Sequence, residues 1–121
     1  MKLATLVLAA SVLAATQLKV TLTAPGHTPR VNTHWSYAVR ATREGKPTAA
    51  RLTAQIVDPI GGRHPVTFGA SSKPITNWAF RGTFRDYVIW PASSRGVPLT
   101  FRLVVRSGGL TKVIRYAVTP R

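Results

Sequence analysis

The chain contains no cysteine and only three acidic residues, Glu44, Asp58 and Asp86. The lack of thiols excludes disulfides, thiolate metal ligands, a cysteine nucleophile and a lipid-modified cysteine. Paired-carboxylate hydrolysis needs two acids about 5–10 Å apart, and Glu44 lies in a predicted turn while Asp58 precedes a proline. The only methionine is Met1, which excludes a thioether copper site in the rest of the chain.

Basic residues, by contrast, are abundant. Lys and Arg number 17, which gives a formal net charge of +14. A charge of this sign and size favours anionic partners. An anionic envelope polymer or an acidic protein is therefore the expected partner. Nucleic acid is electrostatically possible, but we do not expect it as a physiological ligand because the first residues predict export.

The beginning of the chain predicts a secretory signal peptide over residues 1–16. Lys2 is followed by an apolar run over residues 3–15 that ends in small residues, which is typical of such leaders. This run is shorter than the ~20 apolar residues of a membrane span, and no second apolar segment follows. We therefore expect a secreted or extracytoplasmic protein with no transmembrane helix in its mature form. The mature domain would comprise residues 17–121 and carry a charge of about +13 (17 − 1 − 3).

After the leader, apolar and polar residues alternate with a period of two, which predicts β-strands. Glycine and proline mark turns at residues 43–47 and 107–109. Apolar residues on both faces near Trp90 predict that the strand before it is central and buried on both sides. Seven or eight short strands without an amphipathic helix indicate an all-β, antiparallel sandwich. A small barrel is the main alternative. The expected strands cover residues 18–24, 35–42, 51–56, 66–68, 75–79, 83–90, 99–105 and 110–118.

The order of these landmarks resembles exported bacterial immunoglobulin-like or fibronectin-III-like domains, and most of all the YtkA-like variety. The resemblance covers residues 18–118 and implies an immunoglobulin-like fold of about seven strands and a place in the cell envelope. The family is sometimes linked to copper, but its His/Met-rich segment has no match here. The residues that carry the resemblance are Asn32 with Trp35-x-Tyr37-x-Val39, Gly45-Lys46-Pro47 before Ala50-x-Leu52, Gly82-x-Phe84, Trp90-Pro91, Gly96 and Leu99-x-Phe101-x-Leu103.

Basic side chains that alternate with core residues are predicted to form a cationic face. If Arg106 and Lys112 lie near each other across the last hairpin, two like charges meet there, and an anion would relieve their repulsion. Arginine also binds phosphate and carboxylate in a bidentate manner. The residues expected to bind an anion or a partner are Arg40, Arg51, Arg81, Arg85, Arg102, Arg106, Lys112 and Arg115.

The irregular stretch over residues 58–79 is predicted to carry binding contacts as well. Trp78 and Phe80 adjoin this stretch and are the best candidates for exposed aromatic contacts. The other large aromatic residues follow the phase of the predicted core. Asp86 shares its phase with core residues, so if buried it must be hydrogen-bonded or ion-paired, and we favour an ion pair with a neighbouring arginine.

Two alternatives remain open. His27, His34 and His64 could meet at one end of a sandwich and bind copper or zinc. Asp58, His64 and a serine at 71 or 72 occur in the order of a hydrolase triad, although the strained G-x-S-x-G turn is missing. The sequence favours a non-enzymatic, exported binding or structural domain without a cofactor. An extracytoplasmic metal-binding domain is the second hypothesis.

Overall fold

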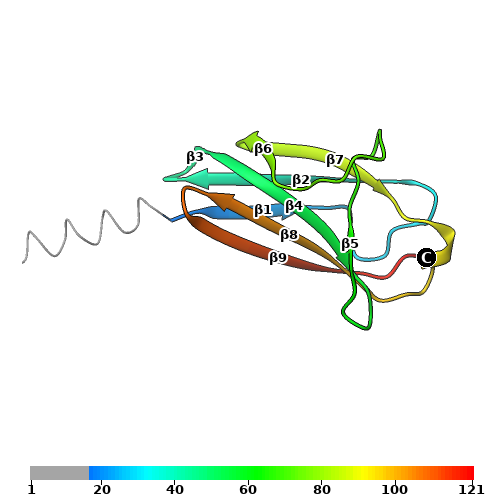
Figure 1. Cartoon of the computed structure of the whole chain (residues 1–121). Helices are drawn as coiled ribbons and strands as arrows, with labels where there is room; N and C mark the ends of the chain where they lie inside the picture. The colour runs from blue at the N-terminus through cyan, green and yellow to red at the C-terminus, as the bar shows by residue number, and fades with distance from the viewer. Residues whose placement is uncertain (1–16) are drawn as a thin grey trace, which may run out of the picture.

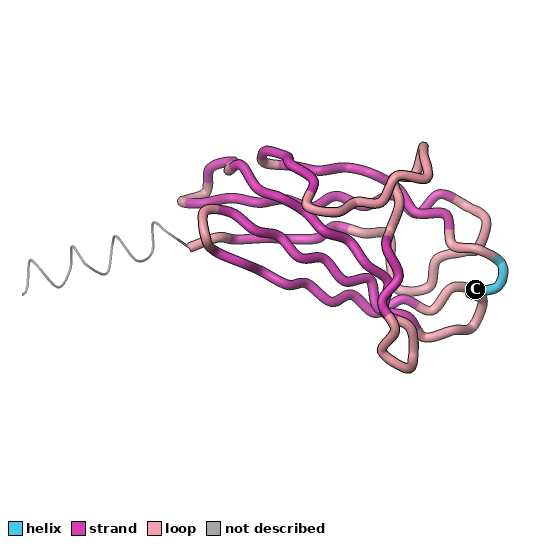
Figure 2. Tube along the Cα trace, viewed as in Figure 1, coloured by secondary structure: helices cyan, strands magenta, loops and turns pink. Residues whose placement is uncertain are grey.

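In a computed structural model, which describes residues 17–121, two antiparallel sheets are stacked face to face (Figure 1). The predicted signal peptide, residues 1–16, lies outside the described residues. Strands make up most of the described chain. One short 3-10 helix, η1 (Ala92–Ser94), lies next to the C-terminus in space (Figure 2). The prediction of an all-β, antiparallel sandwich is confirmed.

The smaller sheet has four strands. β2 is its centre and pairs with β1 on one side and with β7 and the short β3 on the other. The turn between β2 and β3 consists of Glu44 and Gly45, with φ values of 54° and 73°, and positive φ at both positions is the geometry of a type I′ turn. The four strands are β1 (Lys19–Thr23), β2 (His34–Arg43), β3 (Lys46–Pro47) and β7 (Thr83–Ile89).

The larger sheet has five strands. β4 pairs with β8, which pairs with β9, and the other edge of β4 is shared by β5 and β6. Gly108 and Gly109 form the predicted turn between β8 and β9, again with positive φ at both positions. The five strands are β4 (Ala49–Val57), β5 (Arg63–Pro65), β6 (Trp78–Arg81), β8 (Leu99–Ser107) and β9 (Leu110–Val118).

The core lies between the two sheets because each strand turns its apolar phase inward. Trp35 is at its centre and contacts Trp90 and Phe101 edge to face, with ring centroids 5.6 and 5.3 Å apart. Burial of several aromatic rings accounts for the stability of a domain without disulfides, since each ring removes on the order of 150–250 Å² from water.

Two predictions about the strands were wrong. β7 is not a central strand: among residues 17–121 it pairs only with β2, and Ile89 on its outer face is 47% exposed. The strands expected at 66–68 and 75–79 are displaced to β5 and β6. Val66 and Ile75 are buried in the connecting loop instead, and their backbones bond to Ala54 of β4. The backbone between β5 and β6 is irregular and keeps only an isolated bridge between Thr67 and Pro74.

The chain passes from one sheet to the other at Gly82, between β6 and β7. Gly82 has a φ of 73°, donates its N–H to Thr48 O and accepts a hydrogen bond from Ala41 N. As a result, Arg81 belongs to the five-stranded sheet and Arg85 to the four-stranded sheet. This crossing decides which basic residues share a face.

Candidate anion-binding face

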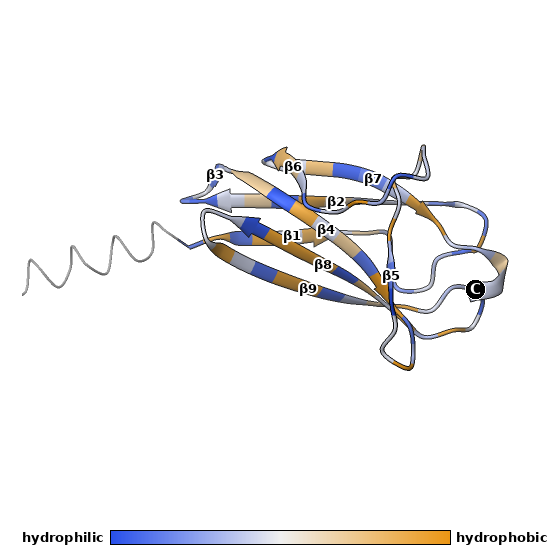
Figure 3. Cartoon of the chain, in the orientation of Figure 1, coloured by the Kyte–Doolittle hydropathy of each residue, from blue (hydrophilic) through white to orange (hydrophobic). Residues whose placement is uncertain are grey.

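Two pairs of arginines face each other across neighbouring strands of the five-stranded sheet. Arg51 of β4 is opposite Arg106 of β8, and Arg102 of β8 is opposite Arg115 of β9. Paired residues in antiparallel strands point to the same side, with Cβ atoms roughly 4.5–5.5 Å apart. Arg51, Arg102 and Arg106 each lie between two buried residues, and Arg115 lies between two half-buried ones, so all four are on the outer face of the sheet. Hydrophilic and hydrophobic residues alternate along β4, β8 and β9 (Figure 3).

Two further arginines belong to the same face. Arg81 is opposite Ala49, which lies two residues before Arg51 and therefore shares its side of the sheet. Arg63 is opposite Val57, and Val57 is opposite Thr100 on β8. Thr100 lies two residues before Arg102, so Arg63 is on the same side of the sheet as Arg102. We call this set of six arginines the cationic face; its members are Arg51, Arg63, Arg81, Arg102, Arg106 and Arg115. Sequence analysis missed Arg63, although the Gly61–Gly62 turn signalled a strand returning to β4.

Two arginines of the cationic face donate hydrogen bonds to neutral acceptors. Arg51 Nη1 donates to Asn77 O at 3.1 Å, and Arg102 Nη1 donates to Gln55 Oε1 at 3.0 Å. Partial burial, followed by the charges of Arg63 and Arg115, lowers the pKa of Arg102 below its usual value. The only ion pair within residues 17–121 joins His64 to Asp58. The face is therefore a crowded array of positive charges without a carboxylate partner in this part of the chain.

Three residues expected on this face lie elsewhere. Arg40 and Arg85 are on the outer face of the four-stranded sheet, where they pair with Thr83 and Ala38. Lys112 is opposite Val105, a buried residue, and so has the inward phase of β9; Thr111, not Lys112, is opposite Arg106. The expected Arg106–Lys112 contact was therefore wrong. The register differs from the expected one by one residue, and a shift of one residue moves a side chain to the other face of the sheet.

The two candidate aromatic contacts differ in exposure. Trp78 is 38% exposed and packs edge to face on Phe68, with ring centroids 4.9 Å apart, while Lys73 Nζ lies 4.9 Å from the Trp78 ring centroid. Phe80 is half-buried and contacts Phe84 in the core. Trp78 therefore offers the larger surface to a partner, beside the 58–79 loop.

The three histidines do not meet. His27 stacks on Tyr116 and bonds through Nδ1 to Ala117 O at 2.6 Å, and His34 stacks on Tyr87. His64 lies apart from both, next to Asp58. Residues 17–121 contain no group of three His, Asp or Glu side chains that could hold a metal ion. The expected metal cluster of His27, His34 and His64 was therefore wrong.

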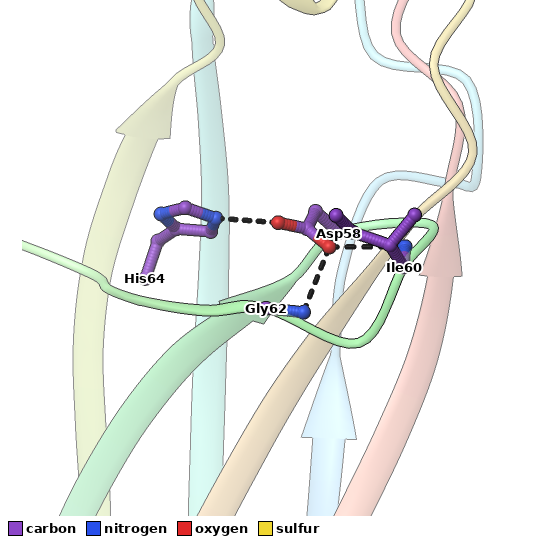
Figure 4. Close-up of polar contacts among 4 residues, drawn as sticks. All are labelled: Asp58, Ile60, Gly62 and His64. Atoms are coloured by element: carbon purple, nitrogen blue, oxygen red, sulfur yellow. Dashed lines mark hydrogen bonds and ion pairs between the residues drawn. The ribbon is translucent and has the colours of Figure 1, made fainter.

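Asp58 organises the turn between β4 and β5 (Figure 4). Its Oδ1 accepts hydrogen bonds from Ile60 N at 3.0 Å and Gly62 N at 2.8 Å, and its Oδ2 lies 2.8 Å from His64 Nε2. The hydrogen bond from His64, followed by that from Gly62, lowers the pKa of Asp58. Ser71 Oγ accepts from Lys73 N instead of completing a triad. Asp58 and His64 therefore stabilise the turn between β4 and β5.

Asp86 does not pair with an arginine, contrary to expectation. It is opposite Tyr37, with the inward phase of β7, whereas its neighbour Arg85 points outward. Both carboxylate oxygens accept from Gly69 N, at 3.2 and 3.1 Å. A Cβ on Gly69 would lie 2.6 Å from the Tyr87 ring, so only glycine allows this close approach. Asp86 thereby anchors the 58–79 loop to β7.

The fold thus defines an all-β protein of two antiparallel sheets. Within residues 17–121, no helix has the length and apolar character needed to cross a membrane. No protein-family model matches the chain, and no curated protein matches it. The structure is similar to that of a DUF4466 family protein from Parabacteroides merdae, with 17% identity and a TM-score of 0.46 over 88% of this chain and 44% of the other. The chain therefore spans less than half of that protein, and a similarity at this level assigns no function.

Proposed function

We propose that the chain is an exported, non-enzymatic, immunoglobulin-like domain that binds an anionic polymer or an acidic partner at the bacterial cell envelope. The observation that supports this proposal is the pairing of Arg51 with Arg106 and of Arg102 with Arg115. Like charges directly opposite each other destabilise a sheet, and a polyanion across the two pairs would turn this repulsion into attraction. Trp78 and the 58–79 loop would extend the contact beyond the arginines.

Retention of residues 17–121 on isolated envelopes across a salt series tests the proposal. Arg102→Glu with Arg115→Glu should abolish retention at low salt without lowering the thermal stability. Arg40→Glu with Arg85→Glu is the matched control, because it changes the net charge equally on the four-stranded sheet. If both double variants lost retention equally, binding would depend on net charge alone, and the proposal of a dedicated binding face would be wrong.

A further inference from the structure

The longest edge strand in residues 17–121 is β9, which ends the five-stranded sheet and runs along one border of the sandwich (Figure 1). Its nine residues pair with β8 without a bulge, from the turn at 108–109 to Val118. The edge strands of the other sheet are shorter, with seven residues in β7 and five in β1. A long, regular strand edge presents unpaired N–H and C=O groups to which another chain can pair.

The register of the last hairpin decides which backbone groups of β9 face this edge. Ser107 and Leu110 flank a two-residue turn and form its hydrogen-bonded pair, so every second residue from Leu110 bonds to β8. The residues between them turn their N–H and C=O groups to the free edge. Thr111, Val113 and Arg115 are exposed, and their backbone groups have no partner within the described chain. The edge therefore offers alternating donors and acceptors to an added strand.

A segment of the chain itself already covers one end of the edge. Thr119 N donates to His27 O at 2.8 Å, and His27 donates through Nδ1 to Ala117 O at 2.6 Å. Residues 28–31 continue the contact along Arg121. The border of the sheet thus accepts an extended segment where the chain supplies one, and it is open between the hairpin turn and Ala117.

Basic side chains lie beside the open part of the edge on both faces of the sheet. Arg115 is exposed on the cationic face, opposite Arg102, and Lys112 is exposed with the opposite phase. A second copy of the chain would bring the same charges to the edge, together with its own net charge of +14. Charged side chains on an edge strand oppose pairing between copies, but they attract a strand that carries carboxylates. The charges therefore favour an acidic segment over a second copy.

We propose that the free edge of β9 binds an extended acidic segment of another protein, which joins the five-stranded sheet as an additional strand. This inference rests on the proposed function and names the class of partner and the way in which it binds. Partner residues opposite Thr111, Val113 and Arg115 would exchange backbone hydrogen bonds with them. Their side chains would lie on the cationic face, because opposed residues point to the same side. A carboxylate there would pair with Arg115, whose neighbour on the other side is Arg102.

Amide hydrogen exchange of 15N-labelled residues 17–121, which contain both sheets and the core, tests the inference. The probe is a blocked peptide of alternating glutamate and valine at low salt, which places its glutamates on the cationic face. Bound peptide should slow exchange at Thr111, Val113 and Arg115 by roughly tenfold or more. The amide of Ile114 already bonds to β8 and should change little. Attraction by charge alone would not protect every second amide.

Two control peptides separate charge from backbone pairing. A peptide of alternating glutamine and valine keeps the backbone groups and should bind roughly tenfold more weakly, because it lacks carboxylates. Equal binding of this neutral peptide would overturn the acidic class of partner. The glutamate peptide N-methylated at its glutamates keeps the charge but lacks the N–H groups that would face β9. It should give no alternating protection, and protection equal to that of the parent peptide would overturn strand addition.

A matched pair of variants tests the edge itself. Val113→Pro removes an N–H group that does not bond to β8, and proline is tolerated where its missing N–H faces away from the sheet. This variant should keep a Tm close to that of the wild type and lose the peptide-induced protection. Val113→Ala keeps the N–H group and should bind as the wild type does, so equal binding by both variants would overturn the inference. If Val113→Pro does not fold, Arg115→Gln replaces it and should weaken binding of the glutamate peptide but not of the glutamine peptide; equal effects on the two would overturn the role of Arg115.

The inference and the proposed function can fail separately. Protection of the same amides that rises with protein concentration in the absence of peptide would assign the edge to a second copy and overturn the acidic partner. No protection by the glutamate peptide, with salt-sensitive envelope retention intact, would overturn this inference alone. An absence of both would overturn the proposed function as well.

Discussion

Arg51 and Arg106 lie directly opposite each other on β4 and β8, and neither has a carboxylate partner within residues 17–121. Directly opposed like charges destabilise a sheet by a few tenths of a kcal/mol up to about 1 kcal/mol. The pair is nevertheless held in place, because Arg51 is bonded to Asn77 O and the buried residues Leu52 and Val105 fix the register beside it. The core therefore holds two like charges opposite each other on the surface of the sheet.

If this repulsion is real, a carboxylate next to Arg106 should relieve it. Thr111 is exposed and lies opposite Arg106 on β9, so Thr111→Glu is expected to raise the free energy of unfolding by about 0.5 kcal/mol at low salt. The gain should largely disappear at 1 M NaCl, where the screening length is about 3 Å. Urea unfolding at both salt concentrations measures it. The control is Thr111→Gln, and an equal gain in this neutral variant would contradict the electrostatic explanation.

The turn between β2 and β3 offers a second test. Glu44 has a φ of 54°, a left-handed conformation that costs an ordinary residue about 1–2 kcal/mol and that asparagine and glycine tolerate better. Glu44→Asn is therefore expected to raise the free energy of unfolding by about 0.5–1 kcal/mol, measured by chemical denaturation. Gly109→Ala, at a φ of 79° in the other two-residue turn, should destabilise by a similar amount. A stabilising Gly109→Ala would show that these turns relax in solution.

These turns also show which features could be predicted from the sequence. Alternation and the Gly108–Gly109 turn fixed the limits of the last hairpin, since a period of two and a tight turn are local properties. Which strand lies beside which is not local. The apolar residues around Ile89 satisfied the pattern of a central strand, yet β7 has one partner within the described residues.

The composition of the site depended on the same non-local information. Arg81 and Arg85 share a phase in the sequence, but the crossing at Gly82 assigns them to different sheets. Lys112 has the inward phase of β9 and lies one residue away from a position on the cationic face. Arg63 belongs to the face because the short strand β5 pairs with β4. The type of residue that forms the face was therefore predictable, whereas its membership required the pairing of the strands.

The acid stability of the β4–β5 turn follows from Asp58. Hydrogen bonds from His64 and Gly62 lower the pKa of Asp58 in the folded state below its ordinary value of 3.8. Its stabilising contribution is therefore present above pH 3.8 and is lost as the pH falls through the lower, folded-state pKa. Asp58→Asn should reduce Tm at pH 7, and the difference from the wild type should shrink below about pH 4. A difference that stays constant from pH 7 to pH 2 would contradict this assignment, and Ser72→Ala in the exposed loop serves as the control.

Tyr37 provides the opposite case, a buried hydroxyl whose removal should be harmless. Its side chain is 3% exposed, and its hydroxyl has no hydrogen-bond partner within residues 17–121. The ring packs on Phe101 with centroids 5.0 Å apart, a contact that phenylalanine can keep. Because an unpaired buried hydroxyl costs about 1–3 kcal/mol of desolvation, Tyr37→Phe should be as stable as the wild type or more stable by about 1 kcal/mol at pH 7.

The advantage of Tyr37→Phe should then grow in alkaline solution. Burial, followed by the negative charge of Asp86, raises the pKa of Tyr37 far above its usual range in the folded state. In the unfolded chain the hydroxyl ionises near pH 10. The wild type is therefore unaffected below pH 10 and loses stability above it, because only the unfolded state can release this proton. Urea unfolding of both proteins between pH 7 and 11 measures the effect. An advantage that does not increase above pH 10, or a loss of more than about 1 kcal/mol at pH 7, would mean that the Tyr37 hydroxyl is paired or reaches solvent.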